Sequence, residues 1–200
     1  MAGLPDAPGI QAAIRLTPGL GVHLRGLADE LLVRDFPGTT LGRAERELLA
    51  TAVSAANDCF FCMDSHGAHA GALIRRTDAE LLPLVDAAKR GSFAPFEPKM
   101  RALLQVAGTV QRAPLELTAG EVEAAREAGA TDADVQLAVL IAAAFSMYNR
   151  IVDGFRARTA PSVDAYAARA EEIAERGYGA APAAPAAPVP AAEGEAASRP

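Results

Sequence analysis

The chain has 200 residues and a formal net charge of −6, and 50% of its residues are hydrophobic, which is enough apolar material for the core of one domain. The acidic balance and the scattered basic residues argue against binding to nucleic acid and against a polybasic membrane patch. Aromatic residues make up only 5% of the chain, whereas alanine and leucine are abundant and favour helices over strands.

Helical patterns follow one another along the chain, and nowhere does the period-two alternation of a strand persist. Residues 11–36 carry two short helical patterns that break near Pro18 and Gly19, before a turn at 37–40. Capping-box residues, and a proline suited to a first helical position, mark several later helix starts. The helices predicted after the turn cover about 43–56, 59–73, 77–90, 98–110, 118–129, 132–156 and 161–176.

The composition changes abruptly near the C-terminus. Residues 179–200 consist largely of alanine and proline, a mixture that resists helix formation and cannot build a core. We therefore predict a flexible N-terminus at 1–9, one folded domain at 10–178 and a disordered tail at 179–200.

No targeting or membrane-spanning segment is recognisable. Residues 1–15 lack the basic start and the apolar run of a signal peptide. The longest apolar stretch, Leu137–Phe145, is shorter than the roughly 20 residues that cross a bilayer. We therefore expect a cytoplasmic protein that binds no membrane. Because cytosolic thiols are kept reduced, a cysteine pair there indicates catalysis or metal binding rather than a structural disulfide.

The only two cysteines, Cys59 and Cys62, form a Cys-x-x-Cys motif just before His66. Either Asn57 or Asp58 is suited to cap a helix that begins there, with Cys59 in its first turn. Steps of three and four residues return to the same helix face, so Cys59, Cys62 and His66 should be neighbours in space.

This placement favours thiol redox chemistry. A helix start, a nearby histidine and a Cys-x-x-Cys setting each lower a cysteine pKa from about 8.5, and the thiolate is the form that attacks a peroxide. His66 is placed to accept the proton of Cys62. Attack leaves a sulfenic acid on one sulfur, the other sulfur condenses with it to a disulfide, and a dithiol donor resets the pair.

Glu47 precedes the motif on an apolar helix and has two interpretations. A carboxylate buried among Leu48, Leu49 and Val53 would need a partner, which favours a proton acceptor or relay beside the cysteines. Alternatively, Glu47 lies exposed near the start of its helix, where an acid favours the helix dipole. The residues alone leave both interpretations open.

His69 extends the face of the motif, which raises the alternative of a zinc site. Four successive ligands on one straight helix cannot surround a tetrahedral ion, and His23 is the only other histidine. We therefore predict no metal site and expect His69 and His23 at a surface or an interface.

Other polar and aromatic residues are interpreted as structural. The polar group after the long apolar run should cap a helix, bridge to another helix or line an oligomer interface rather than catalyse. It comprises Asn149, Arg150 and Asp153. The aromatic residues expected in the core or in a pocket wall are Phe60, Phe61 and Phe145.

The segment from Leu41 to His66, with Glu47, the Cys-x-x-Cys motif and His66 at their spacing, resembles the alkyl hydroperoxidase D-like (AhpD-like) branch of the carboxymuconolactone decarboxylase superfamily. It is most similar to the uncharacterised peroxidase-related members of that branch, and Asn149–Gly154 also looks like that group. The resemblance covers about residues 35–155. Two positions depart from the pattern, because Asp58 stands where glycine is common and Phe61 where some members carry histidine or tyrosine.

The resemblance implies an all-α fold of orthogonally packed helices that assembles as a homo-oligomer, often a trimer or a multiple of one. It also implies a peroxidase in which Cys62 reacts with the hydroperoxide, Cys59 resolves the product, and Glu47 and His66 relay protons. The implied reductant is a dithiol such as a dihydrolipoyl group, with no haem, flavin or metal. Two alternatives are a redox-sensing or structural oligomer without turnover, and a decarboxylase-type lactone enzyme of the same superfamily, against which the thiol pair counts.

Overall fold

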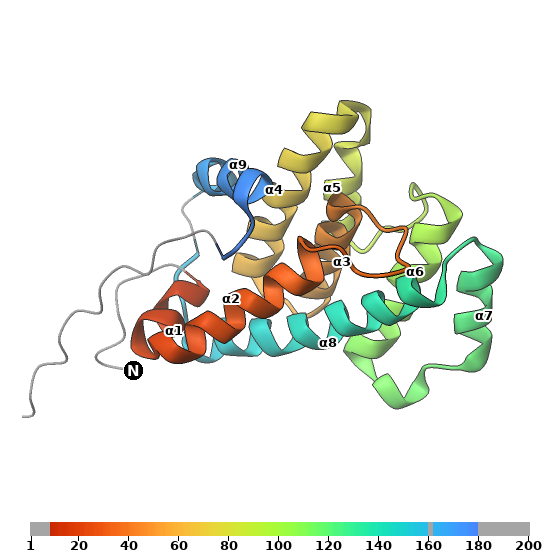
Figure 1. The fold of residues 1–200 in the computed structure, drawn as a ribbon, viewed down its shortest axis with the longest axis horizontal. Coiled ribbons are helices and arrows are strands. Elements are labelled where there is room, and N and C mark those ends of the chain that lie inside the picture. The colour runs from red at the N-terminus through yellow and green to blue at the C-terminus, as the bar shows by residue number, and fades with distance from the viewer. Residues whose placement is uncertain (1–8, 160–161, 180–200) are drawn as a thin grey trace, which may run out of the picture.

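The computed structural model describes residues 9–159 and 162–179, and every regular element in these residues is a helix (Figure 1). The all-α prediction is confirmed. The predicted flexible N-terminus at 1–9 and the predicted tail at 179–200 lie outside the described residues, except for Gly9 and Gly179. The α-helices are α1 (Ile10–Leu16), α2 (Pro18–Leu32), α3 (Arg43–Ala56), α4 (Phe60–Thr77), α5 (Pro83–Lys89), α6 (Pro98–Arg112), α7 (Ala119–Glu127), α8 (Asp132–Gly154) and α9 (Ala167–Arg176). Three short 3₁₀ turns connect them: η1 (Ala79–Leu81), η2 (Pro114–Glu116) and η3 (Val163–Tyr166).

The predicted helix after residue 77 differs from the structure. Thr77 still belongs to α4, and the chain leaves the helical conformation only at Asp78, whose side chain accepts a hydrogen bond from Glu80 N at 3.1 Å. That bond caps the short turn η1, and α5 begins only at Pro83, where proline is suited to a first helical position. The capping residues therefore start a 3₁₀ turn rather than the predicted helix.

Helix α3 lies at the centre of the molecule and contacts α4, α5, α6 and α8 (Figure 1). Its residues 46–54 are all buried, the apolar Leu48–Ala50 and Ala52–Val53 together with polar neighbours. Each fully buried leucine such as Leu49 stabilises the fold by roughly 1.5–3 kcal/mol. A polar side chain on this helix consequently points into the protein and must find a partner there.

Asp134 ties the loop before α3 to the start of α8. Its buried carboxylate accepts hydrogen bonds from Thr39 Oγ1 at 2.6 Å, from Thr40 N at 2.7 Å and from Thr131 N at 3.0 Å. Burial alone would raise the pKa of Asp134, but these hydrogen bonds more than offset it and hold the pKa far below its usual range. These hydrogen bonds hold the loop before α3 against the start of α8, and so help to set the position of α3 in the core.

Helix α8 runs for 23 residues, close to the predicted span of 132–156, and contains the apolar stretch Leu137–Phe145. It is the one helix among the described residues that is long and apolar enough to cross a membrane by length and composition. However, 56% of its most apolar window is buried inside the protein, as expected for the central helix of a globular core. The cytoplasmic location stays a prediction.

The C-terminal segment packs back onto the core, and α9 lies against α4 (Figure 1). The Arg43 guanidinium donates to the last carbonyls of α9, Ile173 O at 2.8 Å and Ala174 O at 2.9 Å, which links this helix to α3. Gly177 then turns the chain with a φ of 76°, a left-handed conformation that favours glycine. Tyr178, which follows it, contacts Glu47 of α3 and His66 of α4.

Candidate functional site

The Cys-x-x-Cys motif begins in the tight connection between α3 and α4. Asn57 ends α3, Asp58 adopts a positive φ of 55°, and Cys59 itself is the N-terminal cap residue of α4. The prediction that Asn57 or Asp58 caps this helix, with Cys59 in its first turn, is therefore wrong by one position. The reversal at Asp58 uses a left-handed conformation that glycine adopts more readily, so the helix can begin only after it.

The two thiols are buried, free and in contact, with 0% of Cys59 and 3% of Cys62 exposed. A hydrogen bond between the two thiols lowers the pKa of Cys59. The same bond, together with burial, raises the pKa of Cys62 well above its usual value. The influences expected to lower a cysteine pKa at this motif therefore do not prevail at Cys62, which keeps its proton at neutral pH.

Two polar side chains of α8 face the thiol pair. Asn149 hydrogen-bonds with Cys62 and also donates to Ser54 Oγ at 3.0 Å, so it bridges α8 to α3 as predicted and in addition touches a thiol. The Asp153 carboxylate lies at Cys59 and opposes the loss of its proton. Arg150 is exposed and donates to Ser146 O of its own helix at 2.7 Å. Asn149 and Asp153, one helical turn apart, therefore both reach the cysteines, which sequence reasoning missed.

Glu47 and His66 form a buried acid–imidazole pair between α3 and α4. Only 1% of Glu47 is exposed, and its Oε2 lies 2.7 Å from His66 Nδ1. The alternative that Glu47 lies exposed near the helix start is therefore wrong. Burial alone would raise the pKa of Glu47, but His66 and His69 reverse the effect and lower the pKa to about 2. Glu47 is thus an ionised carboxylate inside the protein.

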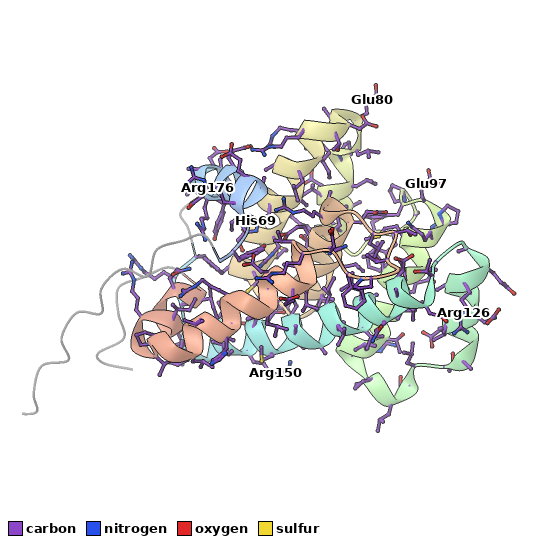
Figure 2. The ribbon with its side chains drawn as sticks, viewed as in Figure 1. His69, Glu80, Glu97, Arg126, Arg150 and Arg176 are labelled. Atoms are coloured by element: carbon purple, nitrogen blue, oxygen red, sulfur yellow. The ribbon has the colours of Figure 1, made fainter. Side chains whose placement is uncertain are left out.

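Tyr178 and His69 complete this cluster, and sequence reasoning missed both. The Tyr178 hydroxyl donates to Glu47 Oε1 at 2.7 Å and lies 2.9 Å from His69 Nδ1. Only 4% of His69 is exposed, so its predicted surface position is wrong, whereas His23 is exposed as predicted. Figure 2 shows His69 on α4, on the side where α9 packs. The spacing of His66 and His69 was a usable signal, because side chains three apart share a helix face.

The hydrogen bonds fix where the protons of the cluster lie. An ionised Glu47 only accepts, so His66 Nδ1 must carry a proton and donate it to Oε2. Burial and the Glu47 charge raise the pKa of Tyr178, so the phenol keeps its proton and donates it to Oε1. His69 Nδ1 must then donate to the Tyr178 oxygen. In the neutral ring of His66, Nε2 is consequently the bare nitrogen that can accept a proton.

A cavity of about 70 Å³ lies between Cys62 and the acid–imidazole cluster. Cys62, His66 and Tyr178 line it, while Cys59 does not. Its apolar walls include Phe61 and Phe145, as predicted, and also Ile10, Leu24, Tyr148 and Val152. Phe60 is instead 63% exposed, so its expected place in the core or wall is wrong. Because one water needs roughly 10–15 Å³ of such space, the cavity accommodates a small molecule of several heavy atoms.

The same cluster offers the donors of a metal site. Ligand atoms of Glu47, His66 and His69 lie within 4.8 Å of one another, and two imidazoles with one carboxylate suit a divalent transition metal. This set differs from the one considered on α4 alone, because the carboxylate comes from α3 and neither sulfur takes part. Hydrogen bonds through Tyr178 satisfy the same atoms without an ion, and binding one would displace the protons on both Nδ1 atoms.

The comparison with known proteins agrees with this arrangement. The model of the carboxymuconolactone decarboxylase family matches residues 27–107, which contain the thiol pair, Glu47 and His66. A crystal structure described as an alkylhydroperoxidase AhpD core, an uncharacterized peroxidase-related protein from Ralstonia eutropha, superposes with a TM-score of 0.68. It is 27% identical to the chain, and the match covers 82% of this chain and 81% of that one.

The chain is therefore similar over residues 27–107 to the carboxymuconolactone decarboxylase family, and its fold is AhpD-like. A second crystal structure, of an uncharacterized peroxidase-related protein from a Silicibacter species, has the same AhpD-like fold, with a TM-score of 0.67 at 23% identity. That match covers 80% of this chain and 78% of the other. None of the curated proteins matches the chain in sequence. Tyr178 lies outside the segment that the family model matches.

Proposed function

We propose that this AhpD-like chain is a thiol peroxidase that reduces small hydroperoxides with Cys62 and Cys59 and is recycled by a dithiol donor. The observation that supports this most is that Cys62, alone of the two cysteines, lines a cavity together with His66. His66 in turn is held by the ionised Glu47. The peroxidase-related description of the Ralstonia eutropha structure agrees with the proposal.

In the first step Cys62 must lose a proton that it holds firmly. His66 Nε2 accepts this proton while the sulfur attacks the outer oxygen of the hydroperoxide. The O–O bond breaks, the outer oxygen with its hydrogen becomes the sulfenic acid of Cys62, and the departing alkoxide takes the proton back from His66 to leave as an alcohol. Glu47 stabilises the imidazolium that forms in between, because its charge lies 2.7 Å from Nδ1.

In the second step Cys59 resolves the sulfenic acid. The Cys59 thiol loses its proton as its sulfur attacks the Cys62 sulfur, and the sulfenic hydroxyl takes up that proton and leaves as water. The resulting disulfide joins two sulfurs that already lie in contact. Two exchange steps with a dithiol, such as a dihydrolipoyl group, restore both thiols and oxidise the donor to its own disulfide. The proposed cycle uses no haem, flavin or metal.

We also propose that the chain works as a homo-oligomer, such as a trimer or a multiple of one. Helices α2 and α8 lie side by side (Figure 1) and both expose large apolar side chains. Such side chains gathered over neighbouring helices are typical of a surface that a second copy covers. They are Leu20, Val22 and Leu27 on α2 and Leu140 and Met147 on α8.

Turnover separates a peroxidase from a redox sensor. With a small organic hydroperoxide and excess dithiothreitol, we expect the wild-type chain to consume many equivalents of peroxide per thiol pair, because the donor resets the disulfide. The measurement is peroxide consumed per chain over time. Consumption that stops near one equivalent would favour a sensor. Activity on a lactone substrate that survives replacement of both cysteines by serine would favour the decarboxylase alternative of the family.

A further inference from the structure

The segment after α9 places one side chain directly on the acid–imidazole cluster. Gly177 turns the chain, and the backbone amide of Tyr178 donates to Asp29 Oδ1 of α2 at 2.6 Å. A Cβ atom at position 177 would lie 2.8 Å from the same oxygen, so the close approach to Asp29 requires glycine there. The position of Tyr178 is therefore fixed by its backbone, independently of its hydroxyl.

The Tyr178 phenol contacts three members of the cluster. Its hydroxyl lies 2.7 Å from Glu47 Oε1, 2.9 Å from His69 Nδ1 and 3.1 Å from His66 Nδ1. Its ring also stacks on the imidazole of His66, with centroids 5.9 Å apart and an interplanar angle of 26°. The hydroxyl thus occupies the point where the carboxylate and both imidazoles meet.

We propose that Tyr178 is a positioning residue of the thiol site, which orients the Glu47 carboxylate and thereby holds His66 with its bare Nε2 available to Cys62. His69 supports it, because the His69 Nδ1 proton occupies the phenol oxygen and directs the phenol proton towards Glu47. This inference rests on the proposed peroxidase function. Tyr178 also brings a hydroxyl to the cluster. The side chain of Phe61, which stands where some family members carry histidine or tyrosine, has none.

Loss of the phenol hydroxyl has two direct consequences. Glu47 Oε1 keeps no donor from Tyr178, so the buried carboxylate is less well stabilised. His69 Nδ1 keeps no acceptor on the phenol, so its proton is free to move to Nε2. Both changes alter the cluster without removing Cys62, Glu47 or His66.

The test is Tyr178→Phe in the full-length chain, with Tyr166→Phe as the matched control. Tyr166 belongs to the same C-terminal segment, and its ring packs on Phe61, 5.7 Å away, rather than on Glu47. We expect kcat/KM for hydroperoxide to fall about tenfold in Tyr178→Phe, the fold-change that one hydrogen bond to a charged group contributes. In the control we expect a change of less than about twofold.

Nitrogen-15 NMR of the histidine rings reports which ring nitrogen carries the proton. This would not change if Tyr178 only stabilised the fold. We expect both His66 and His69 to carry the proton on Nδ1 in the wild type, and His69 to shift towards the Nε2–H form in Tyr178→Phe. The exposed His23 should not change in either variant. Unchanged kcat/KM together with unchanged signals of His66 and His69 would overturn the proposal.

Asp29 provides a second route that leaves the phenol in place. Asp29→Ala removes the acceptor of the Tyr178 amide and should lower kcat/KM in the same direction, whereas Asp29→Asn retains an acceptor oxygen and should restore it. Equal rates in both variants would count against positioning by this segment. A stoichiometric divalent ion bound by the wild type and lost in His69→Ala would also overturn the proposal, because the cluster would then be a metal site. Activity that survives Cys62→Ser refutes the peroxidase mechanism instead, and the histidine signals still test Tyr178.

Discussion

Cys62→Ser is expected to lower kcat/KM for hydroperoxide by at least about a thousandfold, because a serine oxygen forms neither a sulfenic acid nor a disulfide. The substitution is small and conserves the shape of the cavity wall, so the fold should be retained. The measurement is the initial rate of peroxide consumption with excess dithiothreitol, with the helical content and the unfolding midpoint compared alongside.

Cys59→Ser is the matched control, because it removes a sulfur that does not line the cavity. We expect it to leave the first reaction of Cys62 intact, with about one equivalent of peroxide consumed when no thiol is added, and to slow turnover with dithiothreitol, which must then resolve the sulfenic acid itself. Full turnover in Cys62→Ser, or a complete absence of reaction in Cys59→Ser alone, would contradict the assigned roles.

Glu47→Gln is expected to lower kcat/KM by roughly a hundredfold, in the range that a general base and its partner contribute. The amide of glutamine has one acceptor where the carboxylate has two. Either His66 Nδ1 or the Tyr178 hydroxyl then faces a donor instead of an acceptor. Glu45→Gln is the control on the same helix, because the Glu45 carboxylate accepts from Gly42 N at 2.8 Å, where an amide oxygen can replace it, and otherwise forms only a longer ion pair of 3.8 Å with Lys99 among the described residues.

Glu47→Gln should also change how the free energy of unfolding depends on pH. The Glu47 pKa is lowered from 4.5 to about 2 in the folded chain, so its contribution is fully present above about pH 4.5 and is lost as the pH falls towards 2. We expect urea unfolding of the wild type to lose on the order of 3 kcal/mol from this group across that window. Glu47→Gln should lack this component, whereas Glu45→Gln should retain it. Identical pH dependences in the wild type and Glu47→Gln would contradict the ionised state of Glu47.

Local signals in the sequence were sufficient for most of the helices. The capping boxes that begin at Thr118 and Thr131 lie where α7 and α8 start, and α3 spans 43–56 as predicted, because capping is decided within a few residues. The boundary at Cys59 was misplaced by one residue because it depends on the left-handed backbone of Asp58. No local pattern distinguishes that conformation from an ordinary N-terminal cap.

In the candidate site too, local features could be predicted from the sequence, whereas features set by distant residues could not. The contact between Cys59 and Cys62 follows from helical spacing and was predicted. Whether Glu47 was buried could not be decided, because its partners come from other parts of the chain. Tyr178, which lies 131 positions from Glu47, left no trace in the sequence around the motif. The raised pKa of Cys62 was not foreseen for a related reason, because it depends on contact with the second thiol and on burial rather than on the motif.

The most direct measurement is chemical trapping of the sulfenic acid in Cys59→Ser after one equivalent of a small organic hydroperoxide. A 1,3-diketone reagent and peptide mass spectrometry locate the adduct. We expect about one adduct per chain, on the peptide that carries Cys62, formed at the rate at which peroxide disappears. Peroxide consumed while Cys62 stays unmodified would contradict the account.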